Sequence, residues 1–279
     1  MDGNWLDLAT QQWVRATGRR VDLSRDFWLR GPIGGTDRIA ASWLADEAAR
    51  QDAVVDTDSQ VVGLLASMSA LDGKRFSAAA LARAVRDFYE QTSRWRLEAS
   101  VTWSPWAWPW GWLLSTVFAR RLEQLALPLR PRDLTAGMAS AVTPLRRDGH
   151  QVAALWLRHL RSTGSVVFSG LYSTAVLPGT GHPAVKVDFP LPHGRLVVLL
   201  APRVGNRGSL ELSSTRARWG GPGAYLVVDT TRGCWARRIA VHEHFRVYVD
   251  DDDDVLRTDH RLTFGSLPVL RLHYRLTPS

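Results

Sequence analysis

The clearest pattern in the chain is an alternation of apolar and polar residues in three runs near its C-terminus, residues 241–249, 256–264 and 270–276. The alternation has the period of a β-strand, because successive side chains of a strand point to opposite faces. The connections, residues 250–255 and 265–269, carry an aspartate run in the first and glycine and proline in the second, as turns do. The pattern predicts three consecutive antiparallel strands with one shared apolar face.

The alternation also predicts how these strands pair. Placing Val249 opposite Leu256, and Phe264 opposite Leu270, aligns the apolar positions of all three runs. A slip of one residue would turn a strand's apolar positions to the other face, so the alignment constrains the register. The predicted cross-strand pairs are Phe245 with His260, Arg246 with Asp259, His260 with Tyr274, and Asp259 with Arg275.

Three polar side chains fall on this apolar face: Glu243, His260 and Tyr274. A carboxylate among apolar groups needs a partner or a raised pKa, and a Glu–His–Tyr set in an apolar pocket is a candidate for general acid–base chemistry. The alternative is a hydrogen-bonded cluster with a structural role only. The same faces carry three candidate ligand-binding residues, Phe245, Thr258 and Leu272.

Residues 94–102 and most of the chain from residue 134 onward are also strand-like. Turn sequences rich in glycine, proline, asparagine and aspartate separate the runs, as expected for an antiparallel meander. So many strands would close into a barrel or fold into a sandwich, and we expect a barrel of about ten strands that resembles lipocalin-type barrels in architecture only. The further expected strands are residues 94–102, 138–146, 152–161, 165–177, 184–189, 196–202, 209–214, 223–230 and 235–249.

The first 93 residues have helical rather than strand-like spacing. Apolar residues recur at helical intervals in two stretches, and two further short helices are compatible with the sequence, which predicts a helical N-terminal region packed on the sheet of residues 94–279. The fold class expected for the whole chain is therefore α+β. The expected helices cover residues 6–16, 61–71, a stretch that begins at Thr36 or Asp37 and runs to Gln51, and a stretch that begins at Ser77.

A tryptophan-rich loop and helix, residues 103–127, follow the first expected strand. Pro105 and Pro109 exclude a continuous strand there, and residues 113–127 have helical spacing. Three interpretations stay open: the loop packs on the sheet, covers a ligand pocket as a lid, or contacts a membrane surface. In the lid interpretation five residues are candidate ligand contacts: Trp103, Trp106, Trp108, Trp110 and Trp112.

The chain is basic, with a net charge of +8, and 33 of its 35 basic residues are arginine. The arginines are spread along the sequence and no nucleic-acid-binding motif accompanies them, so nucleic acid is not an expected partner. A single cysteine, Cys234, excludes an internal disulfide. Residues 1–20 lack the apolar region of a signal peptide, and no apolar run is long enough to span a bilayer. The expected location is the cytoplasm, and the oligomeric state stays open.

No metal site or cofactor motif is expected. His242 and His244 resemble the histidine pair of the cupin family, but the family's next glutamate is absent and neighbouring arginines would repel a cation. Residues 250–254 lack the spacing of a calcium loop. Phosphate-binding and dinucleotide-binding glycine motifs are also absent.

The expected function is therefore the binding of an apolar small molecule, such as a polyketide, a terpenoid or a lipid-like compound, inside the barrel. The same cavity would suit a cofactor-independent cyclase, isomerase or lyase in which Glu243, His260 and Tyr274 move a proton. A carrier without catalysis, or a protein with weak membrane-surface contact, is the alternative. The sequence does not decide whether the protein is an enzyme.

Overall fold

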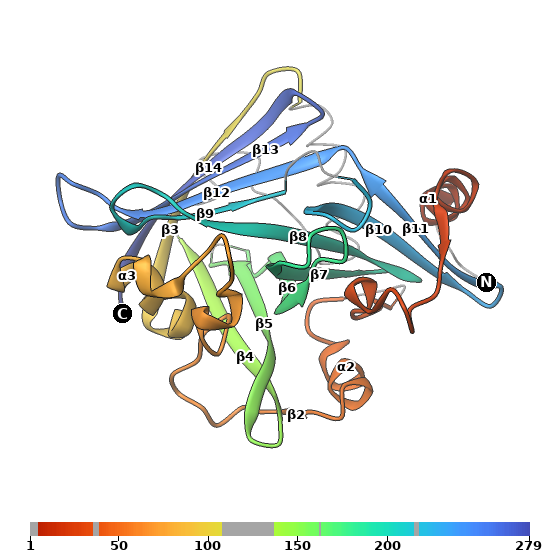
Figure 1. Ribbon diagram of the computed structural model, residues 1–279, viewed down its shortest axis with the longest axis horizontal. Coiled ribbons are helices and arrows are strands. Elements are labelled where there is room, and N and C mark those ends of the chain that lie inside the picture. The colour runs from red at the N-terminus through yellow and green to blue at the C-terminus, as the bar shows by residue number, and fades with distance from the viewer. Residues whose placement is uncertain (1–4, 36–38, 108–136, 162, 215–217) are drawn as a thin grey trace.

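The computed structural model describes residues 5–35, 39–107, 137–161, 163–214 and 218–279, and strands dominate it (Figure 1). In these residues there are three α-helices: α1 (Trp5–Thr17), α2 (Leu44–Arg50) and α3 (Arg83–Glu90). The strands are β1 (Arg19–Val21), β2 (Val54–Val55), β3 (Trp95–Trp103), β4 (Met138–Arg147), β5 (His150–Leu160), β6 (Val166–Val176), β7 (Pro183–Leu191), β8 (Gly194–Val204), β9 (Leu210–Ser213), β10 (Gly223–Thr230), β11 (Gly233–Ile239), β12 (Val241–Val249), β13 (Leu256–Phe264) and β14 (Leu267–Pro278).

All fourteen strands belong to one sheet, and every ladder between them is antiparallel. The main path runs β2-β4-β5-β6-β7-β8-β9-β12-β13-β14-β3. The sheet forks at β8, which pairs with β10 over its first half and with β9 over its second half. From β10 a short branch continues through β11 to β1. The protein is thus mostly β, and the predicted antiparallel sheet is confirmed.

The predicted closure into a barrel is wrong. β3 is the last strand of the main path, and β4 is the second strand from the opposite end of that path. β3 and β4 approach each other, but no ladder joins them in the described residues. The expected single strand over residues 235–249 is also wrong, because the chain divides at Ala240 into β11 and β12, which lie in different branches. This division, together with the short strands β1 and β2 in the N-terminal region that was expected to be helical, explains why the strands outnumber the expected ten.

The C-terminal strands have the predicted faces, with one change of register. β12 and β13 pair as predicted, with Phe245 opposite His260 and Val249 opposite Leu256. β14 begins earlier than expected, after a tight turn at Gly265, and an irregularity follows Leu262 in β13. Over residues 256–262 the shift is two residues, so these side chains keep their faces, and beyond the irregularity it is three. Phe264 therefore pairs with Leu267, His260 with Leu272, Asp259 with His273 and Thr258 with Tyr274, which corrects the predicted β13–β14 pairs.

The N-terminal segment covers the outer face of the sheet. Trp28 and Leu29 pack on buried residues of β8, β10 and β11, and α2 packs on β4, β5 and β6. The buried Arg195 of β8 fixes this segment, because its Nε donates to the Leu29 carbonyl at 2.8 Å and its Nη1 to the Gly31 carbonyl at 3.0 Å. Its Nη2 lies 2.7 Å from Asp229, so the charge is balanced.

Residues 61–94 pack against the opposite, inner face of the sheet. Phe88 and Tyr89 of α3 join the largest buried cluster together with side chains of β3, β5–β9 and β12–β14. The helix predicted over residues 61–71 is wrong except for a 3₁₀ turn at Met68–Leu71. The remainder is irregular, with bends at residues 64–66, and the end of α3 accepts one of its hydrogen bonds: the amide of Leu65 donates to the Tyr89 carbonyl at 3.2 Å.

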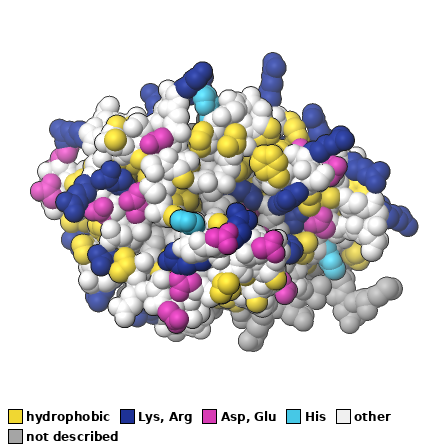
Figure 2. Space-filling model, turned by 60° about the horizontal axis from the view of Figure 1, so that its bottom comes forward, with side chains coloured by type: hydrophobic (Ala, Val, Ile, Leu, Met, Phe, Trp, Pro, Cys, Tyr) yellow, Lys and Arg dark blue, Asp and Glu magenta, His cyan; other side chains and the backbone are white. Residues whose placement is uncertain are grey.

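Charge is dispersed over the molecular surface seen in Figure 2. On this face Lys and Arg side chains alternate with Asp and Glu, and many of the basic groups stand at the outline. They do not gather into one patch on this face. The expectation that nucleic acid is not a partner stays a prediction.

Candidate functional site

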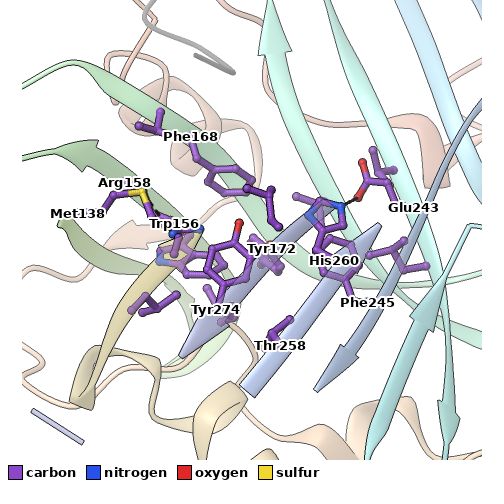
Figure 3. Close-up of a pocket in the computed structure, with 18 of the residues that line it drawn as sticks. Met138, Trp156, Arg158, Phe168, Tyr172, Glu243, Phe245, Thr258, His260 and Tyr274 are labelled. Carbon is purple, nitrogen blue, oxygen red and sulfur yellow. Dashed lines mark hydrogen bonds and ion pairs between the residues drawn. The ribbon is translucent and has the colours of Figure 1, made fainter. Parts of the chain in front are cut away.

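A cavity of about 140 Å³ lies on the inner face of the sheet. Its wall is almost wholly apolar, and it is contributed by both arms of the sheet together with α3 (Figure 3). On one side are side chains of β3 and β12–β14, and on the other are side chains of β4–β8. The lining residues that carry nitrogen, oxygen or sulfur in their side chains are Tyr89, Met138, Trp156, Arg158, Tyr172, Glu243, Thr258, His260 and Tyr274.

The carboxylate of Glu243 and the imidazole of His260 form a close pair, ionic when the imidazole is protonated, at one side of this cavity. The Oε2 of Glu243 lies 3.6 Å from the Nε2 of His260, and both side chains are largely buried. This distance exceeds a hydrogen bond, and the Nε2 has no hydrogen-bond partner among the described residues. The imidazole is held by Phe245, whose ring stacks on it with centroids 3.8 Å apart and planes 15° apart. The pair is therefore oriented but not closed by a hydrogen bond.

Arg158 and Tyr274 lie on the other side of the cavity from this ion pair (Figure 3). The guanidinium of Arg158 stands 5.0 Å from the ring centroid of Tyr274 and 5.0 Å from that of Trp156. Trp156 is fixed by its Nε1, which donates to the Ser140 hydroxyl at 2.6 Å. A cation held between two aromatic faces is attracted by both rings.

Tyr172 of β6 also lines the cavity. Burial raises the pKa of the Tyr172 phenol well above its usual value, and the charge of Glu243 adds to the rise while Arg158 opposes it. The phenol therefore stays protonated at neutral pH and presents a hydrogen-bond donor. Trp156 packs edge-on against its ring, with centroids 5.6 Å apart, and Phe168 lies tilted beside it, with ring centroids 6.2 Å apart.

The structure brings together the residues predicted from the C-terminal strands. Glu243, His260 and Tyr274 line one cavity, and so do the predicted ligand contacts Phe245, Thr258 and Leu272. Their chemical roles stay predictions.

The predicted tryptophan contacts are not brought to the cavity in the described residues. Trp103 packs on a neighbouring apolar cluster. Trp106 is exposed, and its Nε1 donates to the Pro268 carbonyl at 2.9 Å. Trp108, Trp110 and Trp112 lie outside the described residues, as does the whole of the predicted helix at 113–127.

Sequence reasoning missed the β4–β7 side of the cavity, and Arg158 above all. A signal was present, because Arg158 lies two residues from Trp156 and two from Leu160 and is therefore on the same face of β5 as these two buried residues. β5 is buried on both faces, however, so its sequence is a continuous apolar run in which no inner face stands out.

The described residues hold no group of three or more His, Cys, Asp or Glu side chains placed to bind a metal ion. Within the same part of the chain, no helix has the length and apolar character needed to cross a membrane.

Comparisons with known proteins assign no family. No protein-family model and no solved structure matches the chain. A protein of Bacillus subtilis (strain 168) with the name "Uncharacterized membrane protein YndJ" is 28% identical over 247 residues. The match covers 88% of this chain and 42% of that protein, so the chain spans less than half of the relative's length. The relative's name refers to a membrane and to no activity.

Proposed function

We propose that this protein binds an apolar small molecule in the inner-face cavity, and that Glu243 and His260 exchange a proton with that molecule. The observation that carries the proposal is the position of an oriented Glu–His ion pair in a cavity whose wall is otherwise mainly apolar.

The size of the cavity limits the ligand. A volume of about 140 Å³ is close to the ~150 Å³ apolar cavity that holds one benzene molecule in another protein. Drug-sized ligands occupy sites of roughly 300–1,000 Å³. The ligand proposed here is therefore a single ring or a short alkyl chain, smaller than the polyketide or terpenoid expected from sequence, unless the sheet arms separate on binding.

The geometry suits proton transfer. A carboxylate and an imidazole that lie slightly beyond hydrogen-bond distance of each other can both move within hydrogen-bond distance of a proton on the ligand. Hydrogen bonds between catalytic groups are often long before the substrate binds. With no water competing in an apolar site, the pair would interact strongly with any acidic group of a ligand. Isomerisation, in which the pair removes a proton from one carbon and returns it to another, would balance without a further reactant. Elimination would also balance if the abstracted proton is passed to the departing leaving group. A carrier that uses the pair for recognition alone is the non-catalytic alternative.

A chromophoric acid separates these cases. We expect saturable binding of 4-nitrophenol, whose phenol and phenolate forms have different absorption spectra. If Glu243 and His260 take up its proton, Glu243→Gln lowers the phenolate fraction of bound probe at fixed pH, while Glu98→Gln, an exposed carboxylate of β3, leaves it unchanged. If Glu243 acts only as a nearby negative charge, its removal raises that fraction instead. A protein that binds neither 4-nitrophenol nor toluene would contradict the binding proposal itself.

A second candidate function, contact with a membrane surface, is supported by an exposed apolar tip. The tip consists of Trp106, Phe264 and Leu267, whose exposed fractions are 43%, 54% and 53%. Phe264 and Leu267 are paired in the β13–β14 hairpin, and Trp106 is bonded to Pro268 beside them. Exposed aromatic and aliphatic groups of this kind favour the membrane interface, and the relative of similar sequence is named a membrane protein.

Flotation with vesicles tests this candidate. We expect the double variant Phe264→Ser with Leu267→Ser to lose most of its binding to vesicles that contain anionic lipid, with little change in melting temperature. Val54→Ser, which removes another highly exposed apolar side chain, is the control and should keep binding. If the wild-type protein does not float, the cytoplasmic location expected from sequence is favoured.

A further inference from the structure

The buried cation Arg158 is the feature of the cavity that the proposed function leaves unexplained. Its relative exposure is 5%, and it projects from β5 into the cavity beside Trp156 and Tyr274. Burying a guanidinium is costly unless the charge is paired and its donors are satisfied.

Those conditions are not met within the described residues. A guanidinium has five N–H donors, yet the Nε of Arg158 has no partner, and its Nη2 has only the Sδ of Met138 at 3.5 Å, a weak acceptor. None of the ion pairs among the described residues includes Arg158. The other buried cations differ: Arg195 lies 2.7 Å from Asp229 and Lys186 lies 2.9 Å from Asp188.

Glu243 does not supply the missing partner. It is the one carboxylate among the described lining residues, but it pairs with His260 on the opposite side of the cavity (Figure 3). Tyr172 and Tyr274 lie between the two charged ends. The contacts of Arg158 with two aromatic faces compensate part of its lost hydration, but no hydrogen bond joins its N–H groups to an oxygen of the described residues.

We propose that the ligand of this cavity is a small monocarboxylic acid whose carboxylate binds Arg158. Carboxylates match the planar fork of a guanidinium and accept two parallel hydrogen bonds from it. The apolar body of the acid would occupy the space between Val187, Leu270 and Leu272, and its far end would point toward Glu243 and His260. The protonated phenol of Tyr172 is a further donor within the same cavity. This inference rests on the proposed function, since it names the ligand class of the same cavity.

Three isosteric probes test the inference by calorimetric titration. Benzoate, benzamide and benzamidine share one shape and differ in charge, being anionic, neutral and cationic. We expect the wild-type protein to bind benzoate about tenfold or more tightly than benzamide, because charge-assisted bonds to a buried cation are the stronger ones. Benzamidine should bind most weakly.

Arg158→Met keeps the length and apolar stem of the side chain and removes its charge. We expect it to abolish the preference for benzoate and to weaken benzamide much less than benzoate, because benzamide loses a hydrogen bond to the guanidinium but no attraction between opposite charges. Arg161→Met, which removes an exposed arginine just beyond β5, is the matched control and should keep the wild-type order. Arg158→Lys should retain a smaller preference, because a lysine offers no bidentate fork.

The outcomes separate the two proposals. If benzamide binds and benzoate binds no more tightly, the carboxylate inference is wrong and the proposed binding function stands. If none of the three probes binds the folded wild-type protein, both proposals are contradicted. The wild-type series does not depend on any variant, so a failure of Arg158→Met to fold leaves the test decisive.

Discussion

Filling the cavity should stabilise the protein and prevent ligand binding. Ala99 of β3 lines the cavity and pairs with Tyr274, so Ala99→Leu places additional methyl and methylene groups into the empty space. The next residue, Ser100, is exposed on the opposite face of the same strand. Ser100→Leu therefore adds the same side chain at a site that does not touch the cavity.

The magnitude follows from the volume. An unfilled cavity costs about 24 cal/mol per Å³, so about 140 Å³ corresponds to about 3 kcal/mol for the whole space. A leucine that fills about half of it should gain about 1.5 kcal/mol, reduced to about 1 kcal/mol by the rotamer freedom that the buried leucine loses.

Urea denaturation and calorimetry measure both effects. We expect Ala99→Leu to raise the free energy of unfolding by about 1 kcal/mol and the melting temperature by about 2–4 °C, and to weaken toluene binding about tenfold or more. Ser100→Leu should change the free energy of unfolding by no more than about 0.5 kcal/mol and leave toluene binding intact. An Ala99→Leu variant that is clearly less stable and still binds toluene would refute the claim of a preformed cavity at this position.

Three further predictions concern individual buried groups. Burial raises the pKa of Asp188 to about 6 from 3.8, so the native state holds its proton more tightly. As pH rises between these values, the free energy of unfolding of the wild type relative to Asp188→Asn should therefore fall by up to about 3 kcal/mol; a difference that does not vary with pH would contradict this. Burial raises the pKa of the Cys234 thiol to about 12, so iodoacetamide should label it at pH 8 only after unfolding, and rapid labelling of the native protein would show otherwise. Trp156→Phe removes the hydrogen bond to Ser140 and should cost about 1–3 kcal/mol in urea denaturation, whereas an unchanged midpoint would show that this bond contributes little.

The inner face of the C-terminal strands could be predicted because its alternation is clean. Glu243, His260 and Tyr274 reached one cavity although the β13–β14 register was two residues in error, since an even shift preserves the face of every side chain. The error itself came from the turn. The alternation does not show where a strand stops, and β14 already begins at Leu267 after a short turn at Gly265.

Other features depended on contacts between distant segments. The division of the strand at Ala240 follows from the fork at β8, about forty residues earlier in the chain, and no local signal marks it. The failure of the sheet to close is equally non-local. Closure would require β3 to pair with β4, and these two strands are separated along the chain by more than thirty residues. Residues 61–67 were expected to be helical but are irregular and bond to residues at and just after the end of α3, since tertiary hydrogen bonds override a weak local preference.

Methyl-resolved NMR during a toluene titration tests the central claim most directly. The account predicts saturable shifts for the methyl groups of Val187, Leu270 and Leu272, which line the cavity, and no shifts for the exposed methyl groups of Leu8 and Val54. Shifts confined to surface methyl groups, or no saturable shifts at all, would contradict the claim that the inner face of this sheet is a ligand site.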